Sequence, residues 1–203
     1  MTTLRGPRVT LRPWRDADLP PFAALNDDPG VMQHLSTRMT REESDAFAQR
    51  IRDHIDTHGF GLWALDVPGL GFAGFVGLSP QVSFALPLPG IAPKPHEIGW
   101  RLARAAWGHG YATEAAALAL RHGFAQLRLP QIVSFTVPHN ERSRRVMERI
   151  GLVRDPSGDF DHPGVDAVAY PRIVHQVLYR LDRDTWQTAH RAGEPSPGGE
   201  PRR

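Results

Sequence analysis

Apolar residues recur every three or four positions in several stretches of the chain, a pattern typical of amphipathic helices. The clearest case starts with the capping-box pattern Thr40-Arg-Glu-Glu43 and continues with Phe47, Ile51 and Ile55 on one helical face. The predicted helices are Asp16 or Asp18 to about Asn26, Thr40 to about His58, Tyr111 to Leu127, and Asn140 to Ile150.

Other stretches are continuously apolar or rich in β-branched residues, and these predict strands. Pro68-Gly-Leu-Gly71 separates two such runs, so we expect a hairpin there. The predicted strands are Val9 to Leu11, Phe60 to Val67, Phe72 to Leu78, His96 to Leu102, Gln131 to Val137, Val174 to Leu181, and a stretch from Leu152 to Phe160. Consecutive strands followed by strand–helix–strand–helix predict an α/β (α+β) protein with a mixed sheet flanked by helices.

The length of 203 residues fits one domain, which we expect to span residues 1–188. Residues 189–203 are rich in Pro, Gly and Ser, a composition that predicts a flexible tail. The start has no apolar stretch after its charges, and no apolar run is long enough to span a bilayer. We therefore expect a soluble, cytoplasmic protein with no membrane partner, either a monomer or a homodimer.

The chain has no cysteine, which excludes thiolate nucleophiles, disulfides and iron–sulfur clusters. Its 24 basic residues against 22 acidic ones give a net charge of +2, too small by itself to indicate a nucleic-acid-binding protein. An arginine-rich nucleic-acid surface stays a weaker alternative, because Arg142, Arg144, Arg145 and Arg149 crowd one short helix. His54 and His58 have metal-ligand spacing, but no third ligand is indicated, so no metal is expected.

The most informative segment runs from the strand His96 to Leu102 through a loop with Gly108 and Gly110 into the helix that begins at Tyr111. Glycines let the backbone approach a ligand, and a helix N-terminus offers free N–H groups and a positive dipole end. This pattern indicates a phosphate or pyrophosphate site. A simple turn is the alternative, since G-x-x-x-x-G-K-[ST] is absent and Thr113 stands where a dinucleotide fingerprint needs its third glycine.

Two motifs carry a resemblance to a known family. Trp107-Gly-His-Gly-Tyr-Ala-Thr-Glu-Ala115 resembles the acetyl-CoA pyrophosphate loop of the GNAT (GCN5-related) N-acetyltransferase superfamily. Asn140 to Leu152 is similar to N-x-x-S-x-x-V-x-E-[KR]-x-G-[FLM], a signature of the branch that acetylates ribosomal-protein N-termini. The resemblance covers about residues 7 to 185. The sequence departs from it at Ala105, where the family has Gln or Arg.

The resemblance implies a GNAT fold with a mostly antiparallel sheet of six or seven strands. The strands at His96–Leu102 and Gln131–Val137 would splay and admit the pantetheine arm of acetyl-CoA. Free backbone groups of Trp100 and Leu102 would bind the arm, and N–H groups from Trp107 to Ala112 would bind the pyrophosphate. The full set of residues implied to contact acetyl-CoA is Trp100, Leu102, Trp107, Gly108, His109, Gly110, Tyr111, Ala112, Asn140 and Arg145. Arg101 and Arg104 are further candidates for the phosphates.

The activity implied is acetyl transfer by direct attack of an amine, which agrees with the absence of cysteine. The resemblance makes Glu97 the general base, with a solvated or ion-paired glutamate as the alternative. The family's usual acid position holds Met147, so Ser143 is the acid candidate, with Tyr179 as a second option and a backbone-bonded hydroxyl as the alternative role for Ser143.

Three further roles remain open. Asn140 binds the pantetheine arm, caps the helix that follows it, or does both. Trp63 and Trp100 line the acceptor cleft or belong to the core. The proline-rich insertion Gln81 to Pro95 forms a lip over the site.

The sequence does not identify the amine acceptor. A protein N-terminus, an antibiotic, a polyamine and an amino acid all stay open. A catalytically idle CoA-binding module is the main alternative function, because Ala105 and Met147 depart from the family pattern.

Overall fold

The structure, a computed structural model, describes residues 2–35, 37–79, 84 and 95–191. Within these residues one sheet has nine strands in the order β1-β2-β3-β4-β5-β6-β9-β7, with β8 paired to β9. All neighbouring strands are antiparallel except β5 and β6, which run parallel. The strands are β1 (Leu4–Arg5), β2 (Thr10–Arg12), β3 (Leu62–Val67), β4 (Gly71–Leu78), β5 (His96–Leu102), β6 (Gln131–Thr136), β7 (Val153–Arg154), β8 (Phe160–Asp161) and β9 (His175–Asp182).

The mixed, mostly antiparallel sheet is confirmed, but the expected number of six or seven strands is wrong. Leu4–Arg5 adds an edge strand that the sequence analysis did not predict. The stretch from Leu152 to Phe160 forms two short strands in place of one. Pro156 lacks a backbone N–H, and Asp155 begins a 3-10 turn at Pro156–Gly158 that separates them.

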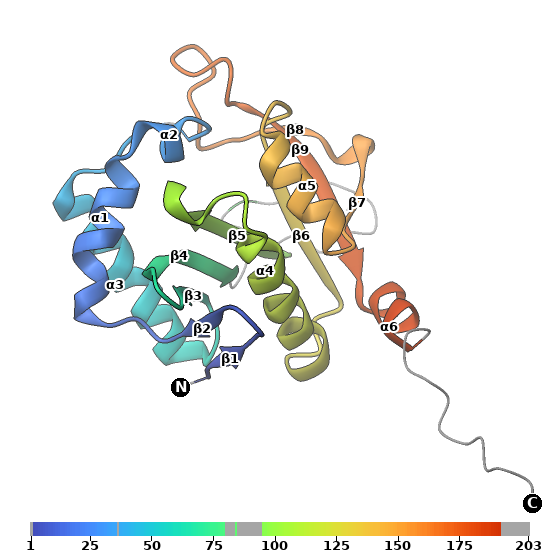
Figure 1. The fold of residues 1–203 in the computed structure, drawn as a ribbon. Coiled ribbons are helices and arrows are strands. Elements are labelled where there is room, and N and C mark those ends of the chain that lie inside the picture. The colour runs from blue at the N-terminus through green and yellow to red at the C-terminus, as the bar shows by residue number, and fades with distance from the viewer. Residues whose placement is uncertain (1, 36, 80–83, 85–94, 192–203) are drawn as a thin grey trace, which may run out of the picture.

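Helices cover both faces of the sheet (Figure 1). Phe75 of β4 packs against Phe22 and Phe47 on one face, while Leu78, three residues further along the same strand, lies against Gly123 on the other. The first face therefore carries α1 and α3, and the second carries α4 and the turn after it. The α-helices are α1 (Leu19–Asp27), α2 (Pro29–Met32), α3 (Arg41–His58), α4 (Tyr111–Arg121), α5 (Glu141–Arg149) and α6 (Arg183–Arg191).

The predicted capping box at α3 is confirmed. The Glu43 N–H donates to Oγ1 of Thr40 at 3.2 Å, and the Thr40 N–H donates to Oε2 of Glu43 at 2.8 Å. The helix predicted from Tyr111 to Leu127 is α-helical only to Arg121. Its end, His122–Gln126, is a π-helical turn closed by the bond from the Leu127 N–H to the His122 carbonyl.

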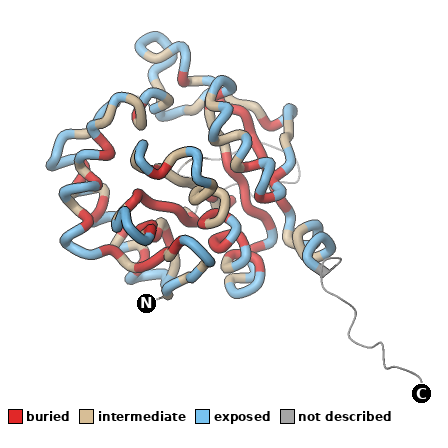
Figure 2. Tube along the Cα trace, in the orientation of Figure 1, coloured by how far each residue is buried: buried red, intermediate tan, exposed pale blue. Residues whose placement is uncertain are grey.

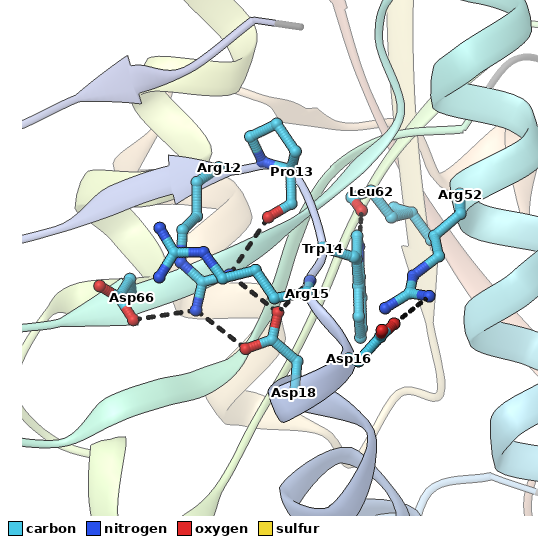
Figure 3. A network of polar contacts seen from close by, with 9 residues as sticks. All are labelled: Arg12, Pro13, Trp14, Arg15, Asp16, Asp18, Arg52, Leu62 and Asp66. Atoms are coloured by element: carbon cyan, nitrogen blue, oxygen red, sulfur yellow. Dashed lines mark hydrogen bonds and ion pairs between the residues drawn. The ribbon is translucent and has the colours of Figure 1, made fainter.

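Most of the buried hydrophobic residues form one core along the strands and the inner faces of the helices (Figure 2). Val133 and Leu178 form a second, smaller cluster. One buried polar network fixes the start of α1 to the sheet (Figure 3). Arg12 of β2 donates to both oxygens of Asp18, at 2.8 and 2.9 Å, and to Asp66 of β3 at 3.1 Å. The Trp14 indole N–H donates to the Leu62 carbonyl at 2.7 Å. The chain entering α1 is thereby held against β2 and β3.

The boundary expected after residue 188 is too early, because α6 continues to Arg191. Trp186 packs on Phe124 with ring centroids 5.4 Å apart, and His190 stacks on Trp186 at 4.3 Å. The rest of the expected tail, and the expected lip at 81–95 apart from Phe84 and Pro95, lie outside the described residues. In the part of the chain that the structure describes, no helix is both long and apolar enough to cross a membrane.

Candidate active site

The candidate site lies where β5 and β6 separate. These strands pair only at His96↔Ile132 and Glu97↔Val133, and the Ser134 hydroxyl donates to the Ile98 carbonyl at 2.8 Å just beyond. Further along, β5 stays paired with β4 while β6 follows β9, so the two strands diverge (Figure 1). The expected splay is confirmed.

Alternate backbone groups of β5 point into this splay. The Ser79 N–H donates to the Glu97 carbonyl, and the Ala103 N–H to the Ala73 carbonyl, so the odd-numbered residues of β5 bond toward β4. In an extended strand the even-numbered residues then point their N–H and C=O groups the other way. The backbone of Trp100 is therefore directed into the splay. At Leu102 only the N–H is free for a ligand, since the Trp107 indole donates to its carbonyl at 2.8 Å.

The loop between β5 and α4 has the backbone of an anion site. Gly108 and Gly110 have φ of 81° and 80°, in the left-handed region that favours glycine. A Cβ atom on Gly108 would meet no described atom within 4 Å, so this side of the loop is open. Gly110 is the N-cap of α4 and makes no side-chain capping bond, which leaves the first N–H groups of the helix available. These features fit a pyrophosphate.

Arg8, which was not predicted as a site residue, lies beside this loop. Its Nη1 donates to the His109 carbonyl at 2.9 Å, and its Nε donates to Glu114 at 2.7 Å. Nη2 lies 3.4 Å from where a Cβ on Gly110 would be, and the guanidinium carbon is 5.5 Å from the Tyr111 ring centroid. Nothing in the local sequence signals this role, because about a hundred residues separate Arg8 from the loop.

The arginines predicted as candidates for the phosphates each bond to another residue of the protein. Arg101 bonds to Asn26 of α1 at 2.6 Å. Arg104 pairs with Asp28 at 3.1 Å, and Arg145 pairs with Glu141 on its own helix at 2.8 Å. Arg142 instead lies over the Trp107 ring, 4.5 Å from its centroid, and so approaches the loop from α5.

Glu97 lies at the point where the splay begins. Its side chain makes no hydrogen bond or ion pair to any residue that the structure describes, so the ion-paired alternative is not what the structure shows. Although the residue keeps intermediate exposure, the loss of water around its carboxyl raises the pKa to about 8. A carboxylate whose pKa lies near neutrality is suited to accept a proton.

Ser143 lies in the first turn of α5 and faces β5. Its Oγ accepts a hydrogen bond from the Trp100 indole N–H at 3.2 Å, which leaves its own O–H free to donate. Asn140 acts as the N-cap: its Oδ1 accepts from the Ser143 N–H at 3.3 Å, and its Nδ2 donates to Thr136 at 2.9 Å. The capping role left open for Asn140 is therefore present. Trp100 packs against the core and also contacts Ser143, so its place in the acceptor cleft stays a prediction.

Two other candidates are core residues. Tyr179 is 1% exposed, and its hydroxyl donates to Glu148 at 3.0 Å while accepting from Arg144 at 3.1 Å. That proton is already engaged, which leaves Ser143 as the better acid. Trp63 is fully buried, with its ring edge-on to His122 at 5.4 Å. The placement of Trp63 in the acceptor cleft is wrong, because a side chain with no exposed surface cannot contact a substrate.

Comparison with known proteins defines the class. Residues 8–153 match the family model for the acetyltransferase (GNAT) domain, and the chain belongs to this GNAT acetyltransferase family. The family implies acetyl transfer from acetyl-CoA. Among the described residues no group of three or more His, Asp or Glu is arranged to hold a metal ion.

Three similar proteins illustrate the relationship. The uncharacterized protein YkkB of Bacillus subtilis is 31% identical over 153 residues, which cover 74% of this chain and 85% of YkkB. FsC-acetyl coenzyme A-N(2)-transacetylase of Aspergillus fumigatus is 27% identical, with coverage of 80% and 68%. The crystal structure of an acetyltransferase from Agrobacterium tumefaciens superimposes with a TM-score of 0.70 at 28% identity, over 89% of this chain and 94% of that one.

Proposed function

We propose that this chain is an N-acetyltransferase that moves an acetyl group from acetyl-CoA to a primary amine by direct attack. The observation that carries the proposal is the Glu97 carboxyl at the start of the splay, which has no partner among the described residues. The Trp100 backbone follows on the same strand, and the loop with Gly108 and Gly110 comes after that strand. Acetyl-CoA supplies a thioester whose carbonyl carbon is open to attack and whose sulfur leaves as a thiol.

The residues that would hold acetyl-CoA form two groups, one on β5 and one in the loop that follows it. The Trp100 backbone and the Leu102 N–H would bond to the pantetheine arm, and N–H groups from Trp107 to Ala112 would bind the pyrophosphate, with Arg8 beside them. A Trp100 N–H directed into the splay is also placed to donate to the thioester carbonyl oxygen and to stabilise negative charge there.

Two side chains handle protons. Glu97 takes the proton that the amine nitrogen loses as its new bond to the acetyl carbon forms. Ser143 gives its hydroxyl proton to the leaving sulfur and regains one from solvent. Because the Trp100 indole N–H donates to Oγ of Ser143, the hydroxyl proton of Ser143 points away from the indole.

A panel of amines tests the proposal. Purified protein is incubated with acetyl-CoA and polyamines, aminoglycosides, amino acids or peptides with free N-termini, and free thiol is measured together with the mass of the product. Thiol release that depends on the amine, with a product heavier by one acetyl group, supports the proposal. Stabilisation by CoA with no turnover of any amine would instead indicate an idle CoA-binding module.

A nucleic-acid-binding role has less support from the contacts of α5. Arg142 lies on Trp107, Arg144 bonds to Tyr179, and Arg145 pairs with Glu141. Three of the four arginines that suggested such a surface thus have partners within the protein.

A further inference from the structure

The face of β5 that carries Glu97 carries a second charged side chain, Arg101. Its guanidinium carbon lies 5.4 Å from the ring centroid of Phe75 in β4 and 5.9 Å from that of Phe47 in α3. Its Nη1 donates to Oδ1 of Asn26 in α1 at 2.6 Å. No acidic side chain within the described ranges is paired with Arg101, so its charge is enclosed by two aromatic rings and one amide.

This environment is unusual for a guanidinium, because buried charges are normally paired. Arg12, a buried arginine of the same chain, is paired with two carboxylates, those of Asp18 and Asp66. Arg101 has no such partner among the described residues, and although the residue keeps intermediate exposure, loss of water around its guanidinium lowers the pKa to about 10. A ligand with a negative charge would pair with Arg101, as no described carboxylate of the protein does.

The hydrogen bond from Arg101 to Asn26 leaves other N–H groups of the guanidinium available to a negatively charged ligand. Asn26 is fully buried, and its Nδ2 donates to Oγ of Ser44 at 2.8 Å, which fixes Oδ1 toward Arg101. With Nη1 engaged, Nε and Nη2 remain, and neither bonds to any residue in the described part of the chain. These two N–H groups form the edge of a guanidinium that binds both oxygens of a carboxylate.

At Gly99, between Arg101 and Glu97, no described residue other than Glu97 comes close to the surface of the strand. Gly99 lies between them on the same face, and a Cβ there would have a single described atom within 4 Å, Oε1 of Glu97 at 3.9 Å. At about 3.3 Å per residue, the Cα atoms of Glu97 and Arg101 are about 13 Å apart along the strand. A slender molecule could therefore lie over Gly99 with one end at each charged residue.

We propose that Arg101 binds a carboxylate of the acceptor, so that the preferred substrates are amines that carry a carboxylate several bonds away, as in short peptides and ω-amino acids. The proposal rests on the proposed function, because it takes the Glu97 end of the strand as the position of the attacking amine. The Asn26–Arg101 contact then serves to present the guanidinium edge to the substrate.

Matched acid–amide pairs test this preference in the wild-type enzyme. Linear ω-amino acids of increasing length are each compared with their carboxamides at saturating acetyl-CoA, with kcat/KM as the readout. A charge-assisted bond of this kind favours the acid by about 10- to 100-fold at the best length. Equal kcat/KM for acids and amides at every length would overturn the proposal.

Variants then assign the preference to Arg101. Arg101→Gln is expected to bring the acid–amide ratio close to one. Arg50→Gln is the matched control: Arg50 also lies on the Phe47 ring, at 5.5 Å, but is exposed, and its substitution should leave the ratio unchanged. If Arg101→Gln fails to fold, as judged by loss of CoA-induced stabilisation, Gly99→Val replaces it. Its side chain fills the open space, so it should raise KM for the acids while both charges stay in place.

A binding measurement separates this inference from the proposed function. N-acetylated ω-amino acids and their amides are titrated calorimetrically into the CoA-bound protein. If no amine is acetylated, yet the N-acetyl acids bind more tightly than the amides and Arg101→Gln removes the difference, the Arg101 site stands and the proposed function fails. An acid preference that persists unchanged in Arg101→Gln, in turnover or in binding, would overturn the Arg101 assignment and leave the proposed function standing.

Discussion

The indole N–H of Trp100 donates to Oγ of Ser143 across 3.2 Å, joining the splayed part of β5 to the first turn of α5. The bond leaves the Ser143 proton available at the place where the thiol would leave.

We therefore expect Ser143→Ala to lower kcat by about 10²-fold, at the lower end of what a general acid contributes, while CoA affinity stays near that of the wild type. Stopped assays of thiol release and calorimetric titration of CoA measure the two effects. Ser157→Ala, which alters an exposed serine outside the site, is the control. A kcat for Ser143→Ala equal to that of the control would remove Ser143 from the acid role.

We expect turnover to depend on pH through the protonation of Glu97. Burial raises its pKa to about 8, and only the carboxylate form accepts a proton. With a weakly basic acceptor that stays neutral, kcat/KM should rise with pH and level off above about 8. Glu97→Gln should lower turnover and abolish this rise, whereas Glu42→Gln, on the exposed surface of α3, should preserve it. Identical profiles for wild type and Glu97→Gln would exclude Glu97 as the base.

We expect substitution of Arg8 to weaken binding of the pyrophosphate of acetyl-CoA and not of the pantetheine arm. Its guanidinium lies at the loop of Gly108 and Gly110, so Arg8→Gln should weaken CoA binding by about fivefold, the scale of an exposed charge contact. Binding of acetyl-pantetheine, which lacks the pyrophosphate, should not change. Arg5→Gln, an exposed arginine of β1, serves as the control. Equal weakening of both ligands would show that Arg8 acts on the fold and not on the phosphates.

We expect loss of the buried ion pair between Arg12 and Asp18 to lower the free energy of unfolding. Their side chains are 8% and 4% exposed, so Asp18→Asn would leave Arg12 with only the partly exposed Asp66. Removing one partner of a buried pair costs about 3–5 kcal/mol of unfolding free energy. Urea denaturation measures the loss, and Asp16→Asn is the control because Asp16 is 92% exposed. Equal stability of the two variants would show that the network does not hold α1 in place.

Local patterns in the sequence were sufficient for much of this fold. The capping box at Thr40 and Glu43 is a contact within one turn, and β5 begins and ends at the residues predicted for it. The edge strand Leu4–Arg5 was missed because two residues carry no periodicity, and it exists only through pairing with β2. The π-helical turn after Arg121 was missed because its sequence reads as a continuing helix.

In the candidate site, too, features set by local sequence were predictable and contacts between distant residues were not. The backbone conformation at Gly108 and Gly110 and the place of Ser143 in the first turn of α5 follow from short motifs, whereas the roles of Glu97 and Ser143 stay predictions. The contacts of Arg8 and Arg101 were not predictable, since they are made with residues far along the chain, His109 and Glu114 for Arg8 and Asn26 for Arg101. Trp63 was misplaced because a tryptophan in a strand reads the same whether it faces a cleft or the core.

The raised pKa of Glu97 also links stability to pH. Its ordinary value is 4.5 and its value in the folded protein is about 8, so between these pH values the folded state keeps a proton that the unfolded state releases. The contribution of Glu97 to stability is therefore full at low pH and declines as pH rises from 4.5 toward about 8. Glu97→Gln stays neutral and escapes this decline. Urea midpoints measured across this range should show the variant gaining on the wild type as pH rises. A constant difference between the two proteins would mean that Glu97 titrates in the folded state as it does in the unfolded chain, and its suitability as a base near neutral pH would lose its physical cause.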